Sequence, residues 1–547
     1  MPTITLQVGQ CGNQLGNTFW ELLQRQKEQL GHGLLAREWF AERHSTATSG
    51  SNEPLLYPRL ICVDSEAKVA GSWGGSSSSI APHQLHILGH AGCGNNWACG
   101  YHFGVSKPKQ RGAAWSSSTE EHQNSRVEQV MEGIRREAEA AAGAVDFLLL
   151  ASLAGGTGSG TGSALLQELA DQFPASTLAA VAVAPGRTGD SPVQSINSCL
   201  AMQHLSQHAH AVLLLDNQAL LDQLSSEARS SSNSSSSSSS AASQGQPRLE
   251  RKPAGAAGNA PSPPAAAAAV LRGACLAGVN RLAAEALAGL LWPLSQQDAL
   301  AGRSSVRQLV ATVCADPLTK CVEVCSLSRP AAAWSSTDDT WSNRVKQLSS
   351  RLPTFDLHNP SQPVITSAAL LIARGVPGTP AAASSRCSSS SSNLRPLQAC
   401  LDSSWCSANC YWAGSGPGSG SAADAVLGYD PAGSSSSSSS SRWQRELCSS
   451  VCSAWPNFAG SVANVYLGSS PVTVAGFRGQ QGEPSLTAAV RRSSTGSFMR
   501  AAAESTLRLC QAGAYMHCYE QYGCSRHDIM AAADGTYDQA EAYLGLC

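Results

Sequence analysis

Ala154-Gly155-Gly156-Thr157-Gly158-Ser159-Gly160-Thr161-Gly162 is the stretch that decides the fold of this chain. It follows the apolar run 145–152, which predicts a buried strand, and precedes 163–172, which has the spacing of a helix. Glycines lack a Cβ, so successive N–H groups can close around phosphate oxygens, and Thr157 and Ser159 add hydroxyl donors. A flexible linker is the alternative for such a composition. Its position between a strand and a helix favours a phosphate-binding loop.

This glycine loop differs from the two best-known phosphate motifs. No Gly-Lys-Ser/Thr follows it, so it is not a P-loop. Its glycine spacing and its position far along the chain also differ from the dinucleotide-binding fingerprint. A glycine-rich loop is weak evidence by itself, so the interpretation depends on the other strand ends.

Strands alternate with helices on both sides of the loop. We expect strands at 3–8, 59–63, 145–152, 177–184 and 211–215, and helices at 13–29, 125–142 and 163–172. Such alternation predicts an α/β fold with a parallel, doubly wound sheet. In sheets of this kind, ligands bind beyond the carboxyl ends of the strands. The residues that directly follow each strand are therefore the candidates for a site.

Two further strand ends carry phosphate-binding chemistry. The first expected strand is followed by Gly9-Gln10-Cys11-Gly12-Asn13-Gln14, where glycines allow a tight turn into a helix whose N-terminus can bind an anion. The second ends at Asp64-Ser65-Glu66. A carboxylate pair there could hold Mg²⁺ through water beside phosphates, and the alternative is that Asp64 caps a helix.

Asparagines mark two more loops. Gly92-Cys93-Gly94-Asn95-Asn96-Trp97-Ala98 combines residues that tolerate left-handed backbone with amide side chains. Asp216-Asn217 follows the strand expected at 211–215. An Asn side chain is both donor and acceptor, so Asn217 can bind the edge of a base.

Composition excludes several classes of protein. Only 14% of the 547 residues are charged and the formal net charge is −2, which argues against a generally basic nucleic-acid surface and against an acidic solvating chain. We expect no secretory signal and no membrane span. The 19 cysteines are scattered and odd in number, which indicates free thiols in a reducing compartment. The pairs Cys406/Cys410 and Cys448/Cys452 fit small buried side chains better than a zinc site.

Two long stretches have low complexity. Residues 225–269 and 384–442 contain serine runs with Gly, Pro and Ala, and 71–79 is a shorter example. Such a composition buries too little apolar area to offset the entropy of ordering, so we expect flexible, disordered insertions. A phosphorylatable linker is the functional alternative.

Taken together, four motifs resemble the tubulin family in order and spacing, once the insertions are set aside: Gly9–Gln14, Gly94–Ala98, Gly155–Gly160 and Asp216–Leu220. The stretch Gly513–Tyr519 is also similar to the helix of the tubulin C-terminal hairpin. The triplets Cys99-Gly100-Tyr101 and Tyr515-Met516-His517 are most like delta-tubulins, with epsilon-tubulins the nearest alternative.

The resemblance implies an organisation for the whole chain. It implies a Rossmann-type GTPase domain, a central helix, a smaller α+β intermediate domain and a C-terminal helical hairpin. In this sequence we expect a GTP-binding domain at 1–224, the first insertion at 225–269, the central helix at 270–292, the intermediate domain at 293–483 with the second insertion at 384–442, and C-terminal helices at 484–547.

Family roles transfer to matching positions as the binding site for GTP or GDP with Mg²⁺. Gln10, Cys11 and Gln14 would contact the phosphates and the base side, and Asn95 would face the γ-phosphate. Asn217 and Asn280 would bind guanine, and Glu66, with Asp64, would lie at the phosphate linked to Mg²⁺. The residues that would cradle the phosphates are Ser152, Ala154, Gly155, Gly156, Thr157, Gly158, Ser159 and Gly160.

Four positions depart from the family pattern. Leu276 stands where tubulins stack an aromatic ring on guanine, an interaction worth ~1–3 kcal/mol per base, so we expect weaker binding. Gln194 replaces the ribose-binding Glu. Gln308 and Ala311 occupy two acidic positions that in tubulin filaments act on the nucleotide of the neighbouring subunit. Neither side chain can act as a carboxylate base, so we expect no hydrolysis of partner-bound GTP through this surface.

The resemblance implies a structural role at centrioles and basal bodies, in assembling triplet microtubules and thus cilia or flagella. The expected partners are other tubulins (alpha, beta and epsilon), without nucleic acid or membrane, in the cytoplasm and cytoskeleton, with the nucleus as a further location. The sequence ends in Ala542-Tyr543-Leu544-Gly545-Leu546-Cys547 without a Glu-rich tail, which argues against a role in the main microtubule wall. A self-sufficient GTPase and a non-polymerising regulator are the alternatives.

Overall fold

The computed structural model describes most of residues 1–237, the expected central helix and the C-terminal helices. The described residues are 1–30, 37–43, 55–66, 80–89, 92–105, 126–141, 143–186, 191–237, 265–292, 305–328, 341–352, 364–374, 458–468, 473–474, 482–483 and 485–545. The segments 71–79 and 384–442 and the cysteine pairs Cys406/Cys410 and Cys448/Cys452 lie outside them.

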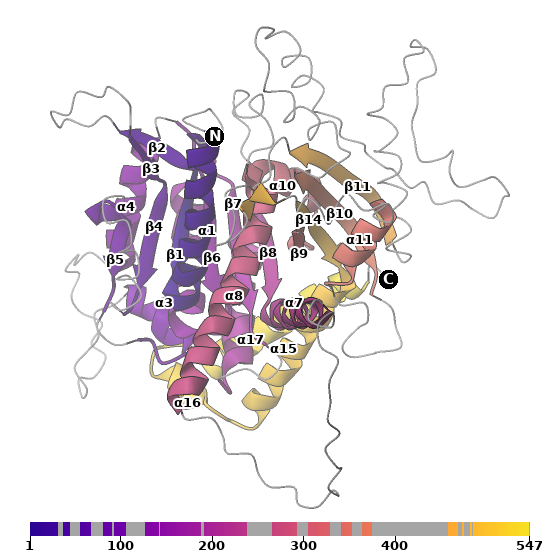
Figure 1. The fold of residues 1–547 in the computed structure, drawn as a ribbon. Helices are drawn as coiled ribbons and strands as arrows, with labels where there is room; N and C mark the ends of the chain where they lie inside the picture. Colours follow the sequence, from indigo (N-terminus) through magenta and orange to yellow (C-terminus); the bar gives the residue numbers. More distant parts are fainter. Residues whose placement is uncertain are drawn as a thin grey trace, which may run out of the picture.

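A single sheet of ten strands forms the centre of the described structure, in the order β11-β10-β14-β9-β8-β7-β6-β1-β4-β5 (Figure 1). Every neighbouring pair in the part β9-β8-β7-β6-β1-β4-β5 is parallel. Strand β14 is antiparallel to both β9 and β10, and β10 is parallel to β11. The bounds are β1 Thr3–Val8, β4 Leu60–Asp64, β5 Leu85–Ile87, β6 Asp146–Ser152, β7 Leu178–Ala184, β8 Ala211–Asp216, β9 Cys321–Ser328, β10 Thr366–Arg374, β11 Phe458–Gly468 and β14 Ser485–Arg492.

Apolar side chains on both faces explain why the central strands are buried. In β6, Phe147 and Leu149 pack into the core on one face of the sheet, while Leu148 and Leu150 pack into the core on the other. This alternation follows from the two-residue period of a strand. A strand that is apolar on both faces must be covered by helices on both sides, as the sequence predicted for a doubly wound sheet.

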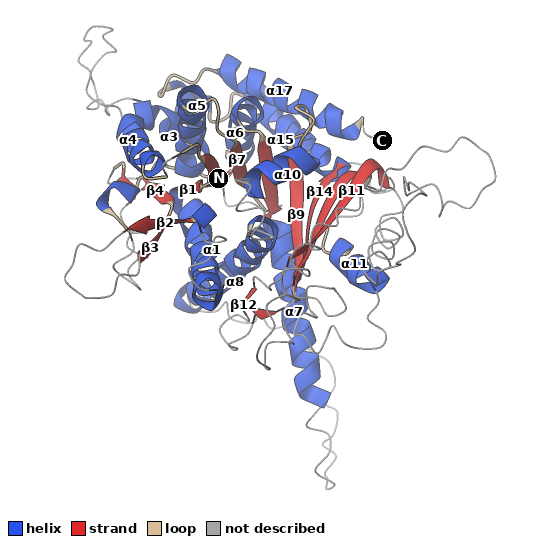
Figure 2. Ribbon diagram, turned by 90° about the horizontal axis from the view of Figure 1, so that it is seen from above, coloured by secondary structure: helices blue, strands red, loops and turns tan. Residues whose placement is uncertain are grey.

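Helices cover both faces of the sheet (Figure 2). The helices on one face are α3 Trp97–Val105, α4 Arg126–Glu139, α5 Gly162–Gln172, α6 Gln194–His208, α15 Ser493–Gln511 and α17 Arg526–Leu544. Those on the other face are α1 Gly9–Leu30, α8 Ala265–Leu291 and α10 Ser305–Val313. The other α-helices that the structure describes are α7 Asn217–Ser237, α11 Trp341–Ser349 and α16 Met516–Glu520. Two small hairpins pair β2 Phe40–Arg43 with β3 Leu55–Pro58 and β12 Thr473–Val474 with β13 Gly482–Glu483. None of the described helices is long and apolar enough to cross a membrane.

Element bounds differ from the sequence expectation at three places. Helix α1 begins at Gly9, directly after β1, so the predicted loop 9–14 is the first part of the helix. Helices α7 and α8 extend into the Ser-rich segment 225–269 from its two ends, and 238–264 lie outside the described residues. Strand β14 precedes α15, so the region from 484 onward is not helical throughout.

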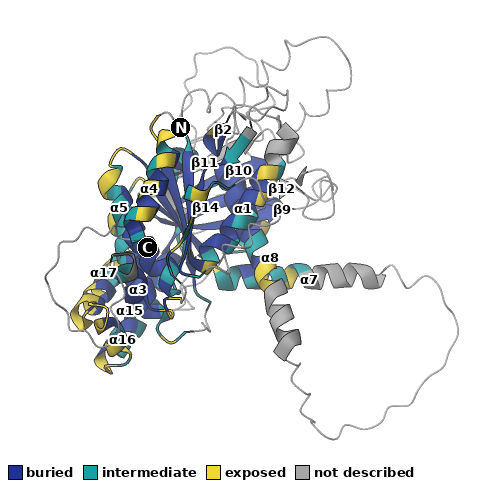
Figure 3. Ribbon diagram, turned by 90° about the vertical axis from the view of Figure 1, so that its left-hand side faces the viewer, coloured by how far each residue is buried: buried dark blue, intermediate teal, exposed yellow. Residues whose placement is uncertain are grey.

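Buried polar contacts tie the C-terminal helices and the central helix to the sheet. The Tyr543 hydroxyl accepts a hydrogen bond of 2.6 Å from the Cys321 main-chain N–H at the start of β9. Arg374 is buried and donates to the main-chain oxygens of Gly289, at 2.8 Å, and Trp292, at the C-terminal end of α8. A cation at the C-terminal end of a helix interacts favourably with the helix dipole. Figure 3 shows the buried sheet enclosed by these helices, with the exposed residues on their outer surfaces.

Candidate nucleotide-binding site

The glycine loop forms a tight turn beyond the carboxyl end of β6. Ala154 N–H donates to Ser152 Oγ at 3.2 Å, and Ser159 Oγ donates to the main-chain oxygen of Gly155. Residues Thr157–Thr161 form a π-helical turn that leads directly into α5. The loop is therefore continuous with a helix N-terminus, the arrangement in which free N–H groups bind anions.

The start of α1 packs against this loop. Gly9 has a φ of +73°, and a Cβ there would lie 2.7 Å from the main-chain N of Gly158. Only glycine combines this backbone with so close an approach. Behind it, Gln10 is exposed, whereas Cys11 and Gln14 are half-buried. The predicted side chains of the first turns are thus brought beside the glycine loop.

The end of β4 joins the same cluster. Ser65 Oγ and Thr157 Oγ1 are 2.7 Å apart and share a hydrogen bond between β4 and the glycine loop. Asp64 Oδ1 accepts from Ser65 N–H at 2.7 Å and from Glu66 N–H at 3.3 Å. Asp64 thus caps its own turn. Burial raises its pKa despite these hydrogen bonds.

The two carboxylates at this strand end fit a divalent cation that also binds phosphate. Asp64 is 4% exposed, and its Oδ2 has no hydrogen-bond partner among the described residues. The Glu66 carboxylate lies against Gly92, where a Cβ would overlap Oε1. Mg²⁺ is usually held by one or two carboxylates, water and substrate phosphates. The described residues contain no cluster of three His, Cys, Asp or Glu side chains that could hold a metal without a phosphate.

The Asn-rich loop completes the phosphate side. Asn95 is exposed with a φ of +54°. Asn96 is buried, and its Oδ1 accepts from Cys99 N–H at 3.1 Å, so it caps α3. Asn197 on α6 donates from Nδ2 to the main-chain oxygens of Asn95 and Ala154, each at 2.7 Å. One side chain thus holds the Asn loop and the glycine loop together.

The predicted base-side residues lie on different elements. Asn217 is the first residue of α7, and Asn280 lies on α8, which packs against α7 where Gly278 meets Leu224. Both side chains are half-buried, and in the described hydrogen bonds neither is joined to the glycine loop. Leu276 is 50% exposed one turn before Asn280, so its side chain is accessible.

A cavity of about 760 Å³ opens beyond the end of β8. Gln194, at the start of α6, and Asp216 are among its lining residues. The cavity continues between α7, α8 and β9 to the first turns of α15. Gln194, which is predicted to bind the ribose, therefore lines this cavity. Asn217, which is predicted to bind guanine, directly follows the lining residue Asp216.

Three residues outside the predicted site set organise the site. Asn197 joins the two loops, Ser65 binds Thr157, and Asn13 donates from Nδ2 to the main-chain oxygens of Gly9, at 2.9 Å, and Val63, at 3.0 Å. Asn13 and Asn197 are both fully buried. Asn13 closely follows a buried strand, and this position is a signal that could have identified it, since buried amides must find partners. Asn197 does not directly follow a strand, so this signal does not apply to it.

The helix that carries Gln308 and Ala311 lies at the opposite, amino-terminal end of the central strands. Arg307 Nε donates to both Asp146 carboxylate oxygens at 3.0 Å, and Asp146 is the first residue of β6. Ser305 donates to Glu38 from its main-chain N–H at 2.8 Å and from Oγ at 3.1 Å. Ala311 is exposed there. These positions cannot act on a nucleotide bound at the carboxyl ends of the strands in the same chain.

Residues 2–225 match the family model described as Tubulin/FtsZ family, GTPase domain. The matched range contains the glycine loop, the Asn loop and the ends of β1, β4, β6 and β8. The fold is α/β and tubulin-like, as the sequence predicted. The match supports the tubulin superfamily, a GTP-binding cytoskeletal role and GTP or GDP as the nucleotide.

Proposed function

We propose that this chain binds GTP or GDP with Mg²⁺ in the cluster formed by α1, the Asn loop and the glycine loop. The observation that carries the proposal is the position of the Asn197 side chain, which hydrogen-bonds to both the Asn loop and the glycine loop at the carboxyl ends of the strands. N–H groups of Gly155–Gly160 and of the α1 N-terminus would bind the phosphates. Mg²⁺, held by Asp64 and Glu66, would neutralise phosphate charge when bound.

The nucleotide test uses the full-length protein. We expect acid denaturation of the purified chain to release guanine nucleotide, identified by chromatography and mass spectrometry. Asn217→Ala should reduce selectivity for guanine over adenine nucleotides, because it removes hydrogen bonds to the base edge. Asp222→Ala, one turn further along α7 and exposed, is the matched control. Release of no nucleotide, together with no binding of added GTP, would refute the proposal.

The cellular role that we propose is that of a delta-type tubulin at centrioles and basal bodies. The support is the resemblance at Cys99–Tyr101 and Tyr515–His517, two segments that pack close together because Asn96 Nδ2 donates to the Cys518 main-chain oxygen at 2.7 Å. The role is assembly of triplet microtubules and cilia with other tubulins as partners.

Rescue in cells tests this role. Ciliated cells that lack their delta-tubulin should regain triplet microtubules when they express this chain, as counted in cross-sections by electron microscopy. A variant that binds no nucleotide should fail to rescue them. Rescue only of cells that lack epsilon-tubulin would instead support the epsilon-type alternative, and a diffuse protein never enriched at centrioles would support a non-polymerising regulator.

We also propose that this chain does not stimulate GTP hydrolysis in a subunit stacked against α10. The support is the exposed Ala311 and the half-buried Gln308, neither of which can act as a carboxylate base. Ala311→Glu combined with Gln308→Glu should introduce stimulation of a partner tubulin, and Thr312→Glu is a matched control on the same helix. Stimulation by the unmodified chain would refute this proposal.

A further inference from the structure

Two thiols lie together beneath the Asn loop, beside the phosphate side of the site. Cys93 precedes Asn95 by two residues, and Cys99 is in the first turn of α3. Both are free thiols, with 5% and 9% of their surfaces exposed. Two consecutive turns bring them to the same side: Asn96 N–H donates to Cys93 O at 3.0 Å, and Cys99 N–H to Asn96 Oδ1 at 3.1 Å. The two thiols interact with each other, and this interaction shifts their pKa values in opposite directions.

Cys93 also contacts the groups that shape the phosphate side. Its thiol interacts with the hydroxyls of Thr157 and Ser65, which are hydrogen-bonded to each other. Its Cβ lies 2.9 Å from the position that a Cβ on Gly156 would occupy. Any change in the Cys93 sulfur therefore acts directly on the glycine loop and on the end of β4.

The two thiols differ in reactivity. Cys99 lies at a helix N-terminus, and its interactions with Cys93 and Tyr522 lower its pKa. The pKa of Cys93 is raised by its interaction with Cys99 and by burial. A thiolate next to a thiol is the usual arrangement of a reactive cysteine and its resolving partner.

We propose that Cys93 and Cys99 form a reversible disulfide in response to hydrogen peroxide, and that this disulfide weakens nucleotide binding at the adjoining phosphate site. The second half rests on the proposed function. The reactant is a small peroxide, and the group that it modifies is the pair of thiols of Cys93 and Cys99.

The chemistry balances with one peroxide for each disulfide. The Cys99 thiolate attacks a peroxide oxygen, the O–O bond breaks, and a sulfenic acid forms as the departing hydroxide takes a proton to become water. The Cys93 sulfur then attacks the sulfenic sulfur, the S–S bond forms, and the hydroxyl leaves with the Cys93 proton as a second water. Two electrons pass from the two sulfurs to the peroxide.

A disulfide changes the contacts of Cys93. The sulfurs must approach to about 2.05 Å, closer than two thiols in non-covalent contact. The Cys93 sulfur is thereby drawn toward Cys99 and away from the hydroxyls of Thr157 and Ser65, so its interactions with them are weakened. Coupling between two sites is reciprocal at equilibrium, so bound GTP should in turn shift the thiol–disulfide equilibrium toward the two thiols.

Two readouts on the full-length reduced protein test the proposal. The first is non-reducing peptide mapping by mass spectrometry after equimolar hydrogen peroxide, which should show a disulfide between Cys93 and Cys99. The second is the affinity for a fluorescent GTP analogue, which should fall about tenfold on oxidation and recover with dithiothreitol. Cys199, whose pKa burial raises to about 11, should stay reduced as the internal control.

Three variants complete the design. Cys93→Ser and Cys99→Ser should each abolish the disulfide and the loss of affinity, whereas Cys275→Ser, at an exposed site on α8, should retain both. Failure to map the disulfide in wild-type protein overturns the proposal, and a mapped disulfide with unchanged affinity overturns the coupling. If the reduced protein binds no GTP, the coupling falls with the proposed function, and peptide mapping still decides the thiol pair.

Discussion

The side-chain amide of Asn197 donates a hydrogen bond of 2.7 Å to the main-chain oxygen of Asn95, across the gap between α6 and the loop before α3. The same amide donates to Ala154, and its oxygen accepts from Trp97 N–H at 2.9 Å and from the Tyr519 hydroxyl at 2.7 Å. One buried residue therefore joins the glycine loop, the Asn loop and the C-terminal helices. The positions of the two phosphate-binding loops depend on it.

We expect Asn197→Asp to weaken GTP binding by roughly 5- to 150-fold. The substitution keeps an acceptor for Trp97 and Tyr519 but replaces the donor to Asn95 and Ala154 with a charge facing two carbonyl oxygens, a loss of about 1–3 kcal/mol. Titration with a fluorescent GTP analogue measures the effect. Tyr519→Phe, which removes only the hydroxyl bond, is the control and should weaken binding less. Equal affinities for wild type and Asn197→Asp would show that the bridge does not position the loops.

How far the sequence could predict this site depends on the kind of residue. Glycines between a strand and a helix have a local signature, so the position of the 155–160 loop at the carboxyl end of β6 could be predicted, and its role in binding stays a prediction. Asn197 has no such signature, because its partners at Asn95 and Tyr519 are distant in the chain and meet only through the parallel sheet. The extent of α7 into the serine run was also missed, since serine is a weak helix former and its composition there resembles a linker.

We expect Leu276→Tyr to tighten GTP binding. Leu276 is 50% exposed on α8, one turn before Asn280, where the family resemblance places an aromatic ring on guanine. Stacking on an aromatic face is worth ~1–3 kcal/mol per base, or roughly 5- to 150-fold in affinity. Equilibrium titration of wild type, Leu276→Tyr and the control Leu276→Ala tests this. A tyrosine variant that binds no better than the alanine variant would place the base elsewhere.

Gly12→Ala should destabilise the fold, whereas Gly535→Ala should not. A Cβ on Gly12 would overlap the main-chain oxygen of Leu150, because α1 crosses β6 closely there. Overpacking of this kind costs about 1–3 kcal/mol. Gly535 lies on α17 with nothing within 4 Å of an added Cβ, and alanine is favoured over glycine in a helix by up to about 1 kcal/mol. Urea unfolding followed by circular dichroism compares the two, and similar destabilisation by both would contradict the predicted close crossing.

Stability should fall as the pH is lowered from 6.5 toward 4, through His204. The His204 ring packs against the rings of Trp97 and Tyr101, with distances of 5.4 Å and 5.2 Å between ring centroids. Burial lowers the pKa of His204 from 6.5 to about 4. Between these values the unfolded chain binds a proton that the folded chain does not, so acid favours unfolding, by about 2 kcal/mol at pH 5. His204→Phe should remove this part of the pH dependence in urea unfolding at pH 7 and pH 5. An unchanged difference between the two pH values would exclude His204 as its source.

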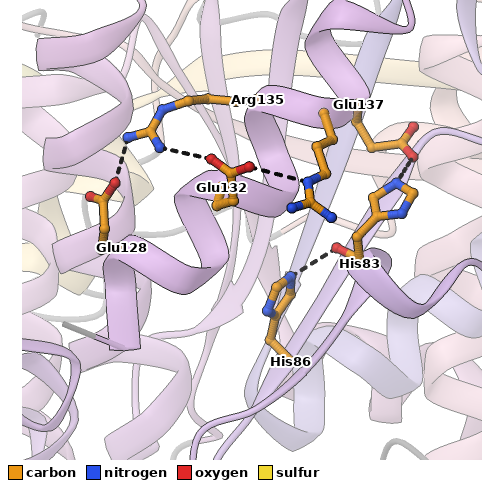
Figure 4. A network of polar contacts seen from close by, with 7 residues as sticks. His83, His86, Glu128, Glu132, Arg135 and Glu137 are labelled. Atoms are coloured by element: carbon orange, nitrogen blue, oxygen red, sulfur yellow. Dashed lines mark hydrogen bonds and ion pairs between the residues drawn. The ribbon is translucent and has the colours of Figure 1, made fainter. Parts of the chain in front are cut away.

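Two contacts on α4 should differ sharply in their worth, although both join a basic side chain to a Glu of the same helix (Figure 4). His83 Nε2 lies 2.7 Å from Oε1 of Glu137, whose side chain is fully buried. The substitution His83→Ala leaves this buried carboxylate short of one partner, which we expect to cost about 1–3 kcal/mol. Arg136→Ala removes a 3.1 Å contact to Glu132 between two exposed side chains, and surface pairs of this kind contribute little because water and salt screen them. The free energies of unfolding in urea should therefore separate the two variants. An Arg136→Ala variant as unstable as His83→Ala would show that burial does not set the strength of these contacts.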